Sequence, residues 1–457
     1  MVSRIADDAG RLHGMVLPGT RRMRREHAAV MTLTLTLVLA AIATGRADAQ
    51  SGSDAVSDDA DPAKTEYASD EYGEGPRDVL DEDSVFRQIW RRRPPLKSLF
   101  GSGASDALES GWRDVNDEIE SHTGLRFGLA YTTLAQWAPN SPEGDQGIAG
   151  DLDFTGIWRL LDAEDAGYLG FATEWRHDIG PRQPAELSGE FDAFSRTTQA
   201  FNEQDFAIVE LWWSQEFLGD RLEITAGKIN PRTFYNTNRL RNQNTTFLNQ
   251  VFTGNRAIGF PGRGGGANAT WRSEETWYLS GGVHDANAVT ASANLGTLDE
   301  GEFAYVMEFG WTPTFEELGR GSYRLTLWHT DSSRARGTDD GTGFALSCDQ
   351  ELGESLIGFV RYAYADGDAL GAKQTLSGGL GINGLFDRDA DLLGLGVGWS
   401  DPSADTFNEE VVAEAFYRLQ VTSSTQLSLG WQGYFTPAFD PDDDVVNVFS
   451  LRWRIQL

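Results

Sequence analysis

The C-terminal segment, Val445–Leu457, is the feature that most constrains the fold, because apolar and polar side chains alternate along it. Its apolar members are Phe449, Leu451, Trp453, Ile455 and Leu457, and the residues between them are Ser450, Arg452, Arg454 and Gln456. Successive side chains of a strand point to opposite faces, so the segment has one apolar and one charged face. An amphipathic edge strand of a soluble protein has this period, but aromatic residues facing lipid and arginines facing water are typical of a transmembrane barrel.

The same period of two recurs along most of the chain. It is found at 125–131, 152–160, 169–175, 209–213, 222–224, 267–271, 277–283, 303–311, 323–327, 344–346, 356–364, 376–382, 393–399, 411–419 and 427–435. Long and short connections alternate between these segments, which is typical of bacterial outer-membrane barrels. The sequence therefore predicts an all-β fold, a transmembrane antiparallel β-barrel of about 16 strands over residues 121–457.

The N-terminal part predicts export. Arginines precede the apolar run 28–43, and Ala47-Asp48-Ala49 is a cleavage site, so residues 1–49 are interpreted as a signal peptide whose true start could be Met23. Residues 50–104 are predicted to be an acidic, largely disordered periplasmic segment and basic linker. A short amphipathic helix is expected at 105–120, and no apolar run after Ala49 is long enough for a spanning helix.

Composition excludes several other classes. The net charge of −31, about a third of it in residues 51–83, argues against nucleic acid as a partner. The single cysteine, Cys348, excludes an intrachain disulfide. The histidines lack metal-ligand spacing, and the acidic run 440–444 is interpreted as a solvated turn rather than a calcium site, so we expect no metal and no cofactor.

The residues opposite the apolar stripes predict the lining of the lumen, because a 16-stranded barrel is too wide for side chains to fill. The longest connection, 230–263, is rich in Asn, Arg and aromatic residues and is expected to fold inward and narrow the pore. The candidates for substrate binding or constriction are Arg159, Glu174, Arg176, Glu210, Arg232, Tyr235, Asn236, Asn238, Arg239, Arg324, Trp328, Arg361, Glu414 and Arg418. Charges of both signs hydrogen-bond sugar hydroxyls, and an aromatic ring such as Trp328 can stack on a sugar; the same charges could also merely hydrate the wall.

A family resemblance rests on the start of this connection. Gly227-Lys228-Ile229-Asn230 is followed by Tyr235, Asn238 and Phe247-Leu248, and further similar stretches are 205–217, 301–310, 349–350 and 413–418. Over roughly 108–457 the chain resembles the carbohydrate-selective porins of the OprB type. The resemblance implies a 16-stranded barrel in the bacterial outer membrane, with an arginine-rich constriction, that lets glucose-like sugars diffuse passively.

The functional expectation is therefore a carbohydrate-selective porin and not an enzyme. Its expected partners are small sugars, outer-membrane lipid and lipopolysaccharide, and it is expected to be a monomer or homotrimer. The alternatives are a porin of other selectivity, for anions or small solutes generally, and a barrel enzyme. The enzyme would need an oriented Ser–His pair, and Ser332 near His329 has no evident orienting group.

Overall fold

The computed structural model describes residues 103–139, 141, 145–161, 167–219, 221–273, 276–292, 295–366, 370–438 and 445–457. The predicted signal peptide, residues 50–102 of the acidic segment and linker, and the turn at 440–444 lie outside the described residues. The last two residues assigned to the linker, Gly103 and Ala104, instead begin a helix.

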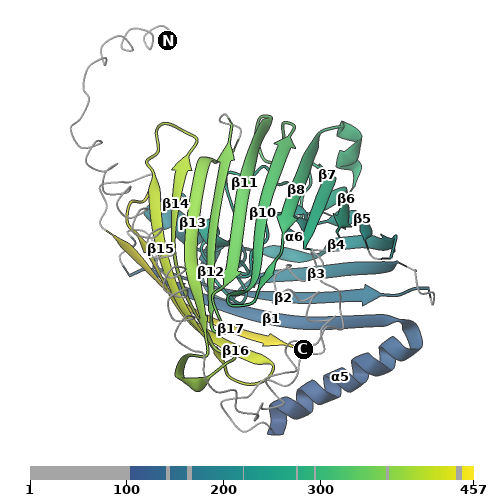
Figure 1. Cartoon of the computed structure of the whole chain (residues 1–457). Coiled ribbons are helices and arrows are strands. Elements are labelled where there is room, and N and C mark those ends of the chain that lie inside the picture. The colour runs from purple at the N-terminus through teal and green to yellow at the C-terminus, as the bar shows by residue number, and fades with distance from the viewer. Residues whose placement is uncertain are drawn as a thin grey trace, which may run out of the picture. The chain divides into compact units, whose positions relative to one another are not determined.

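The described chain forms an antiparallel barrel of sixteen long strands (Figure 1). The long strands are β1 (Leu125–Trp137), β2 (Gln146–Trp158), β3 (Tyr168–Asp178), β4 (Gln204–Phe217), β5 (Leu222–Ile229), β6 (Gly264–Arg272), β7 (Trp277–Asp285), β8 (Phe303–Trp311), β10 (Gly319–Thr330), β11 (Gly341–Glu351), β12 (Leu356–Ala365), β13 (Ala372–Asn383), β14 (Leu392–Pro402), β15 (Glu410–Gln420), β16 (Thr425–Tyr434) and β17 (Val446–Gln456). A two-residue strand, β9 (Thr314–Phe315), extends the turn before β10. β1 pairs with both β2 and β17, which closes the sheet and confirms the predicted fold.

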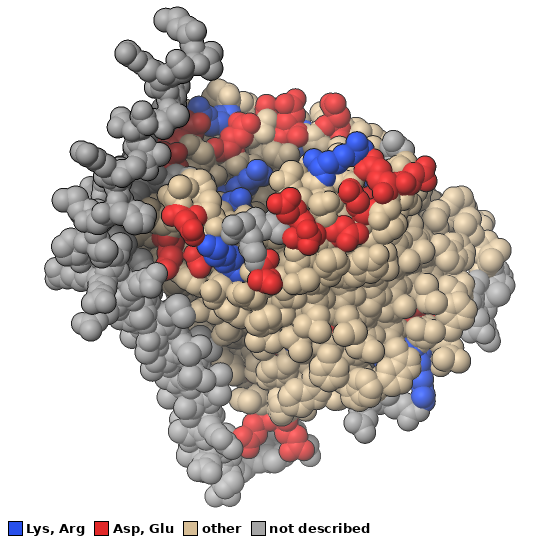
Figure 2. Space-filling view, turned by 90° about the horizontal axis from the view of Figure 1, so that it is seen from above, with Lys and Arg blue, Asp and Glu red and all other residues tan. Residues whose placement is uncertain are grey.

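The strands are apolar on the outside and polar on the inside. On β17, Leu451 is 46% exposed and Trp453 is 37% exposed, whereas Arg452 and Arg454 are each 2% exposed. Apolar side chains therefore cover the outer wall, and Figure 2 shows a broad area of the surface without acidic or basic residues. This inverted arrangement is stable against lipid and unstable in water.

The longest connections lie at one rim of the barrel, as expected. Long connections at 179–203, 230–263 and 286–302 lie at one rim, and short turns at 352–355 and 421–424 lie at the other. The longest connection contains α6 (Pro231–Phe234) and α7 (Gln250–Thr253), and 179–203 contains the 3₁₀ helix η2 (Pro184–Phe191). Two further 3₁₀ turns are η3 (Gly296–Glu300) and η4 (Leu385–Asp387).

Helix α5 (Gly103–Thr123) extends the predicted helix at both ends and packs along β1. Leu457 forms the last backbone pair of the seam, with Leu129, so the N–H of Phe127 lies beyond the end of β17. The side-chain oxygen of Asn116 accepts a hydrogen bond from that N–H at 3.0 Å, and the ring of Trp112 packs edge-on against Phe127 at 5.3 Å. The helix thus covers an otherwise unpaired strand edge. Among the described residues, no helix is long and apolar enough to cross a bilayer.

Candidate functional site

The connection 230–263 folds into the barrel because its backbone is hydrogen-bonded to side chains on the inner wall. The N–H of Asn236 donates to Glu308 on β8 at 2.6 Å. The carbonyl of Thr237 accepts from Arg324 on β10 and from Ser347 on β11, each at 2.9 Å. Asn236 has a positive φ of 51°, a conformation that asparagine tolerates better than most residues, and this turns the chain toward the wall.

The second half of this segment is held by β12 and β15, which follow β11 in the sheet. Glu414 on β15 accepts hydrogen bonds from the N–H groups of Leu248 and Asn249 at 2.7 and 2.8 Å. Asn249 also caps α7, since its side-chain oxygen accepts from the N–H of Val251 at 3.0 Å. Arg361 on β12 donates to the carbonyl of Phe252 at 2.5 Å and so fixes the end of the same helix.

A second segment, 179–203, also enters the barrel. The N–H groups of Phe194 and Ser195 both donate to Glu410 on β15 at 2.7 Å. The two inserted segments contact each other, because Gln243 accepts from the N–H of Ala200 at 2.8 Å. They therefore form one hydrogen-bonded unit.

Apolar packing inside the lumen supports this unit. The ring of Phe247 lies 4.7 Å from that of Phe252 and 5.0 Å from that of Phe416 on β15. The cluster around them also contains Leu187, Phe191, Leu240, Phe359 and Tyr434, all buried. This apolar layer thus packs against β12 and β14–β17, whereas another side of the wall is charged.

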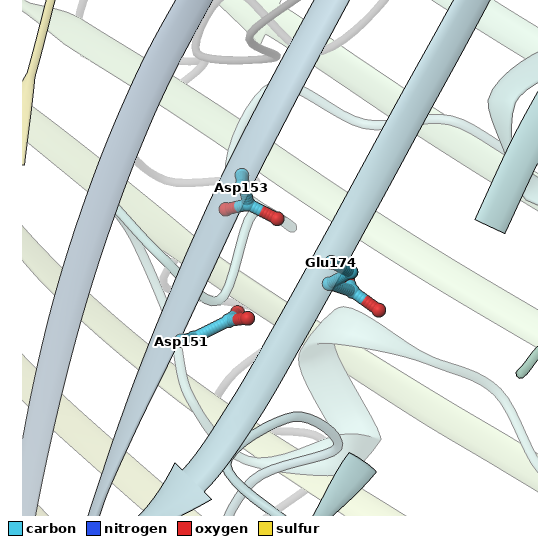
Figure 3. Close-up of side chains that lie close together, drawn as sticks. All are labelled: Asp151, Asp153 and Glu174. Carbon is cyan, nitrogen blue, oxygen red and sulfur yellow. The ribbon is translucent and has the colours of Figure 1, made fainter. Parts of the chain in front are cut away.

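That charged side lies on β2 and β3. Asp151, Asp153 and Glu174 each place an oxygen within 4.8 Å of the others, and Figure 3 shows them projecting from adjacent strands. Arg176 pairs with Glu174 at 2.9 Å, and Arg263, just before β6, pairs with Glu174 at 3.1 Å and Glu210 at 3.5 Å. Such a carboxylate trio could hold a cation, but guanidinium groups already supply the compensating charge, so we assign it to an ion-pair network.

Arg263 is the last residue of the connection 230–263, so its ion pairs join that segment to the network. Burial lowers its pKa, but Glu174 and Glu210 outweigh that effect and raise the pKa above its ordinary value. Its charge is therefore fixed at any physiological pH. Asp151, Glu174 and Glu210 are buried in the network, whereas Asp153, Arg176 and Arg263 are partly exposed. These three side chains supply one acceptor and two donors, the kind of groups that hydrogen-bond hydroxyl groups.

Twelve of the fourteen predicted site residues fall into three groups in the structure. The first group lies on the inner wall and contacts the backbone of the connection 230–263; its members are Arg324, Arg361, Glu414 and Arg418. Glu174, Arg176 and Glu210 belong to the charge network. The residues on the inserted segment itself are Arg232, Tyr235, Asn236, Asn238 and Arg239.

The inserted residues are mostly engaged with the barrel. The hydroxyl of Tyr235 donates to Asn268 at 2.5 Å, and Arg239 pairs with Asp349 at 2.5 Å. Asn238 accepts from the N–H of Leu240 at 2.9 Å. Arg232 is half-buried at the start of α6.

Two predicted residues lie apart from these contacts. Arg159 follows the last residue of β2, at the rim of short turns, and pairs with Glu120 of α5 at 3.7 Å. Trp328 points inward but is only 4% exposed, because Gly259 of the inserted segment lies against its ring. Its faces are covered and cannot stack on a sugar in this structure.

Sequence reasoning missed several residues of the interior. Asp151 and Asp153 lie opposite the outward-facing Leu152 and Phe154, so the alternation of β2 could have identified them. Glu410 lies on the same face of β15 as Glu414, so the alternation could have identified it as well. Arg336 had no such signal, since its contacts depend on where the inserted segment 230–263 lies.

Comparison with known proteins gives an independent view of the chain. Residues 159–457 match the family model described as "Carbohydrate-selective porin, OprB family". Proteins named Porin AaxA are similar: that of Chlamydia felis (strain Fe/C-56) is 24% identical and covers 73% of this chain and 78% of its own length, and that of Chlamydia pneumoniae is 24% identical and covers 82% and 90%. The structure titled "High pH structure of Pseudomonas putida OprB" matches with a TM-score of 0.65 at 16% identity, over 76% of this chain and 97% of that one.

Proposed function

Because the chain belongs to the OprB family of carbohydrate-selective porins, we propose that glucose-like monosaccharides diffuse passively through its lumen. The chain is an outer-membrane porin and not an enzyme. The finer assignment, to small neutral sugars, is what the interior supports. A sugar is a small solute whose hydroxyl groups both donate and accept hydrogen bonds, and it has little to gain from a wall of a single charge.

The observation that carries this proposal is the paired network on β2 and β3. Asp153 offers an acceptor, and Arg176 and Arg263 offer donors, all partly exposed within one patch of wall. The inserted segments pack against β12 and β15 and also, through η2, against β1 and β2. At the charged patch, the hydroxyl groups of a sugar can replace water of hydration with these donors and acceptors.

Swelling of proteoliposomes in isosmotic solutions tests the proposal. We expect glucose to enter faster than a neutral glycol of similar mass, and a trisaccharide to enter much more slowly than either. The double variant Asp151→Asn with Asp153→Asn should reduce the advantage of glucose over the glycol, while Asp114→Asn on α5, an exposed position, should preserve it. Equal rates for glucose and the glycol in the wild-type protein would contradict the proposal.

A further inference from the structure

Strand β4 places two consecutive tryptophans on opposite faces of the barrel wall. Trp213 lies opposite Leu169 on the lipid-facing side. Trp212 lies opposite Gly170 of β3 and shares the inner face of β4 with Glu210. The indole of Trp212 is only partly buried. Because this side chain points inward, the part of its ring that the protein leaves uncovered faces the lumen.

The indole of Trp212 lies across the wall rather than in a packed core. A Cβ atom on Gly170 would lie 2.3 Å from Cζ2 and 2.4 Å from Cη2 of Trp212, so the six-membered ring lies over the backbone of that glycine. The residue opposite on β5 is Gly227, which has no side chain either. The ring of Tyr168 meets the indole in a T-shaped contact at 5.8 Å, and its hydroxyl donates to Glu223 at 3.2 Å. The wall thus covers one face of the indole and holds it in place.

Polar groups of the charge network border this ring. The indole N–H of Trp212 donates to Oε2 of Glu210 at 3.3 Å, and Arg263 pairs with Oε1 of the same carboxylate at 3.5 Å. Glu210 is buried, so it serves to hold the indole beside the guanidinium group. Arg263 is itself partly exposed. The wall therefore presents an aromatic ring and a hydrogen-bond donor side by side.

An aromatic face next to hydroxyl-binding groups fits a cyclic sugar. The face of an indole carries negative partial charge and attracts the weakly positive hydrogens of C–H groups. In the pyranose ring of glucose the hydroxyl groups project sideways, and the axial C–H bonds form two weakly apolar faces. An open-chain polyol carries the same kind of hydroxyl groups and has no such face. The charge network can bind the hydroxyl groups of both solutes, whereas the indole favours the cyclic one.

We propose that Trp212 is a stacking site for the pyranose ring of the transported sugar, next to the charge network on β2 and β3. This inference rests on the pore function proposed above and narrows its substrate class to cyclic sugars in preference to open-chain polyols. Trp212 lies closer than Glu210 to the short turn between β4 and β5. A sugar that leaves the network toward the rim of short turns therefore passes the indole.

Blocking of the single-channel current by added solutes tests this site. In the wild-type protein, glucose should block at concentrations about threefold or more below those of mannitol, an open-chain polyol of similar mass. Trp212→Leu should remove this difference by weakening the block by glucose, and Trp212→Phe, which keeps an aromatic face, should retain part of it. Trp213→Leu is the matched control, because it replaces the adjacent lipid-facing tryptophan, and it should preserve the difference.

Two kinds of result would overturn the stacking site. The first is equal blocking by glucose and mannitol in the wild-type protein, a comparison that needs no variant to fold. The second is an unchanged difference in conducting Trp212→Leu channels, or an equal loss in Trp213→Leu. If glucose outpaces the glycol in swelling but blocks no better than mannitol, the stacking site fails and the sugar function stands. Equal entry of glucose and the glycol would overturn both.

Discussion

Glu414 on the wall of the barrel accepts a hydrogen bond from the backbone N–H of Leu248 at 2.7 Å, although the two residues are 166 positions apart. A second bond, from Asn249, uses the other carboxylate oxygen. The inserted segment is therefore held by a buried carboxylate that binds two adjacent backbone groups, an arrangement that fixes orientation as well as position.

Replacing Glu414 with alanine should loosen this segment. Two buried N–H groups would lose their acceptor, at a cost of about 1–3 kcal/mol each. We expect larger and noisier single-channel conductance in Glu414→Ala, with the barrel still inserted. Glu354→Ala, in an exposed short turn, is the control and should behave as the wild type. Conductance of unchanged size and noise would show that Glu414 does not hold the segment.

Gly227 should not tolerate a side chain. Its φ is 141°, and a Cβ atom there would lie 2.4 Å from the carbonyl oxygen of Leu211. Such strain costs about 1–3 kcal/mol, so Gly227→Ala is expected to lower the temperature at which the barrel loses its heat-modifiable migration on gels. Gly189→Ala, where a Cβ would meet nothing within 4 Å, should leave that temperature unchanged. Equal transition temperatures for the two variants would refute this explanation of the glycine.

The seam between β1 and β17 should depend on Asn116. Its side chain satisfies the N–H of Phe127 at the end of the closing pair of strands. Asn116→Ala removes that acceptor from a buried position, and we expect a loss of about 1–3 kcal/mol in stability. Urea unfolding monitored by tryptophan fluorescence measures it, with Asp114→Ala on the exposed face of α5 as the control. A midpoint equal to that of the control would mean that α5 does not stabilise the seam.

The carboxylates on β2 should favour the passage of cations. Removing the charges of Asp151 and Asp153 leaves Arg176 and Arg263 in excess, so Asp151→Asn with Asp153→Asn should raise the chloride-to-potassium permeability ratio by about twofold or more. Asp114→Asn, at an exposed position of α5, is the control and should leave the ratio unchanged. An unchanged ratio in the double variant would show that these carboxylates do not act on the passing ions.

The barrel could be predicted from the sequence because period two persists in each strand, as the outward Trp453 beside the inward Arg452 and Arg454 illustrates. The inward direction of Glu174, Arg324, Arg361 and Glu414 follows from the same alternation. Their partners do not, since alternation is silent about where a connection of 34 residues folds. Trp328 is inward-facing, as expected, but Gly259 covers it, which only the path of the inserted segment reveals.

The helix and the charge network show the same limit. Helical spacing located α5, yet its role at the seam depends on the last backbone pair, Leu129 with Leu457, lying two residues short of Phe127. Arg263 closes the longest connection, and only its position against β3 makes it a partner of Glu174. Local patterns thus determine the direction of a side chain, and tertiary structure determines what it contacts.

The most direct test of a sugar-conducting lumen is the current through single channels in a planar bilayer with glucose added on one side. The account predicts stepwise conductance that glucose lowers in a saturable manner, while a large, impermeant polyethylene glycol at equal viscosity leaves it unchanged. Channels whose current is insensitive to glucose at every concentration would contradict it.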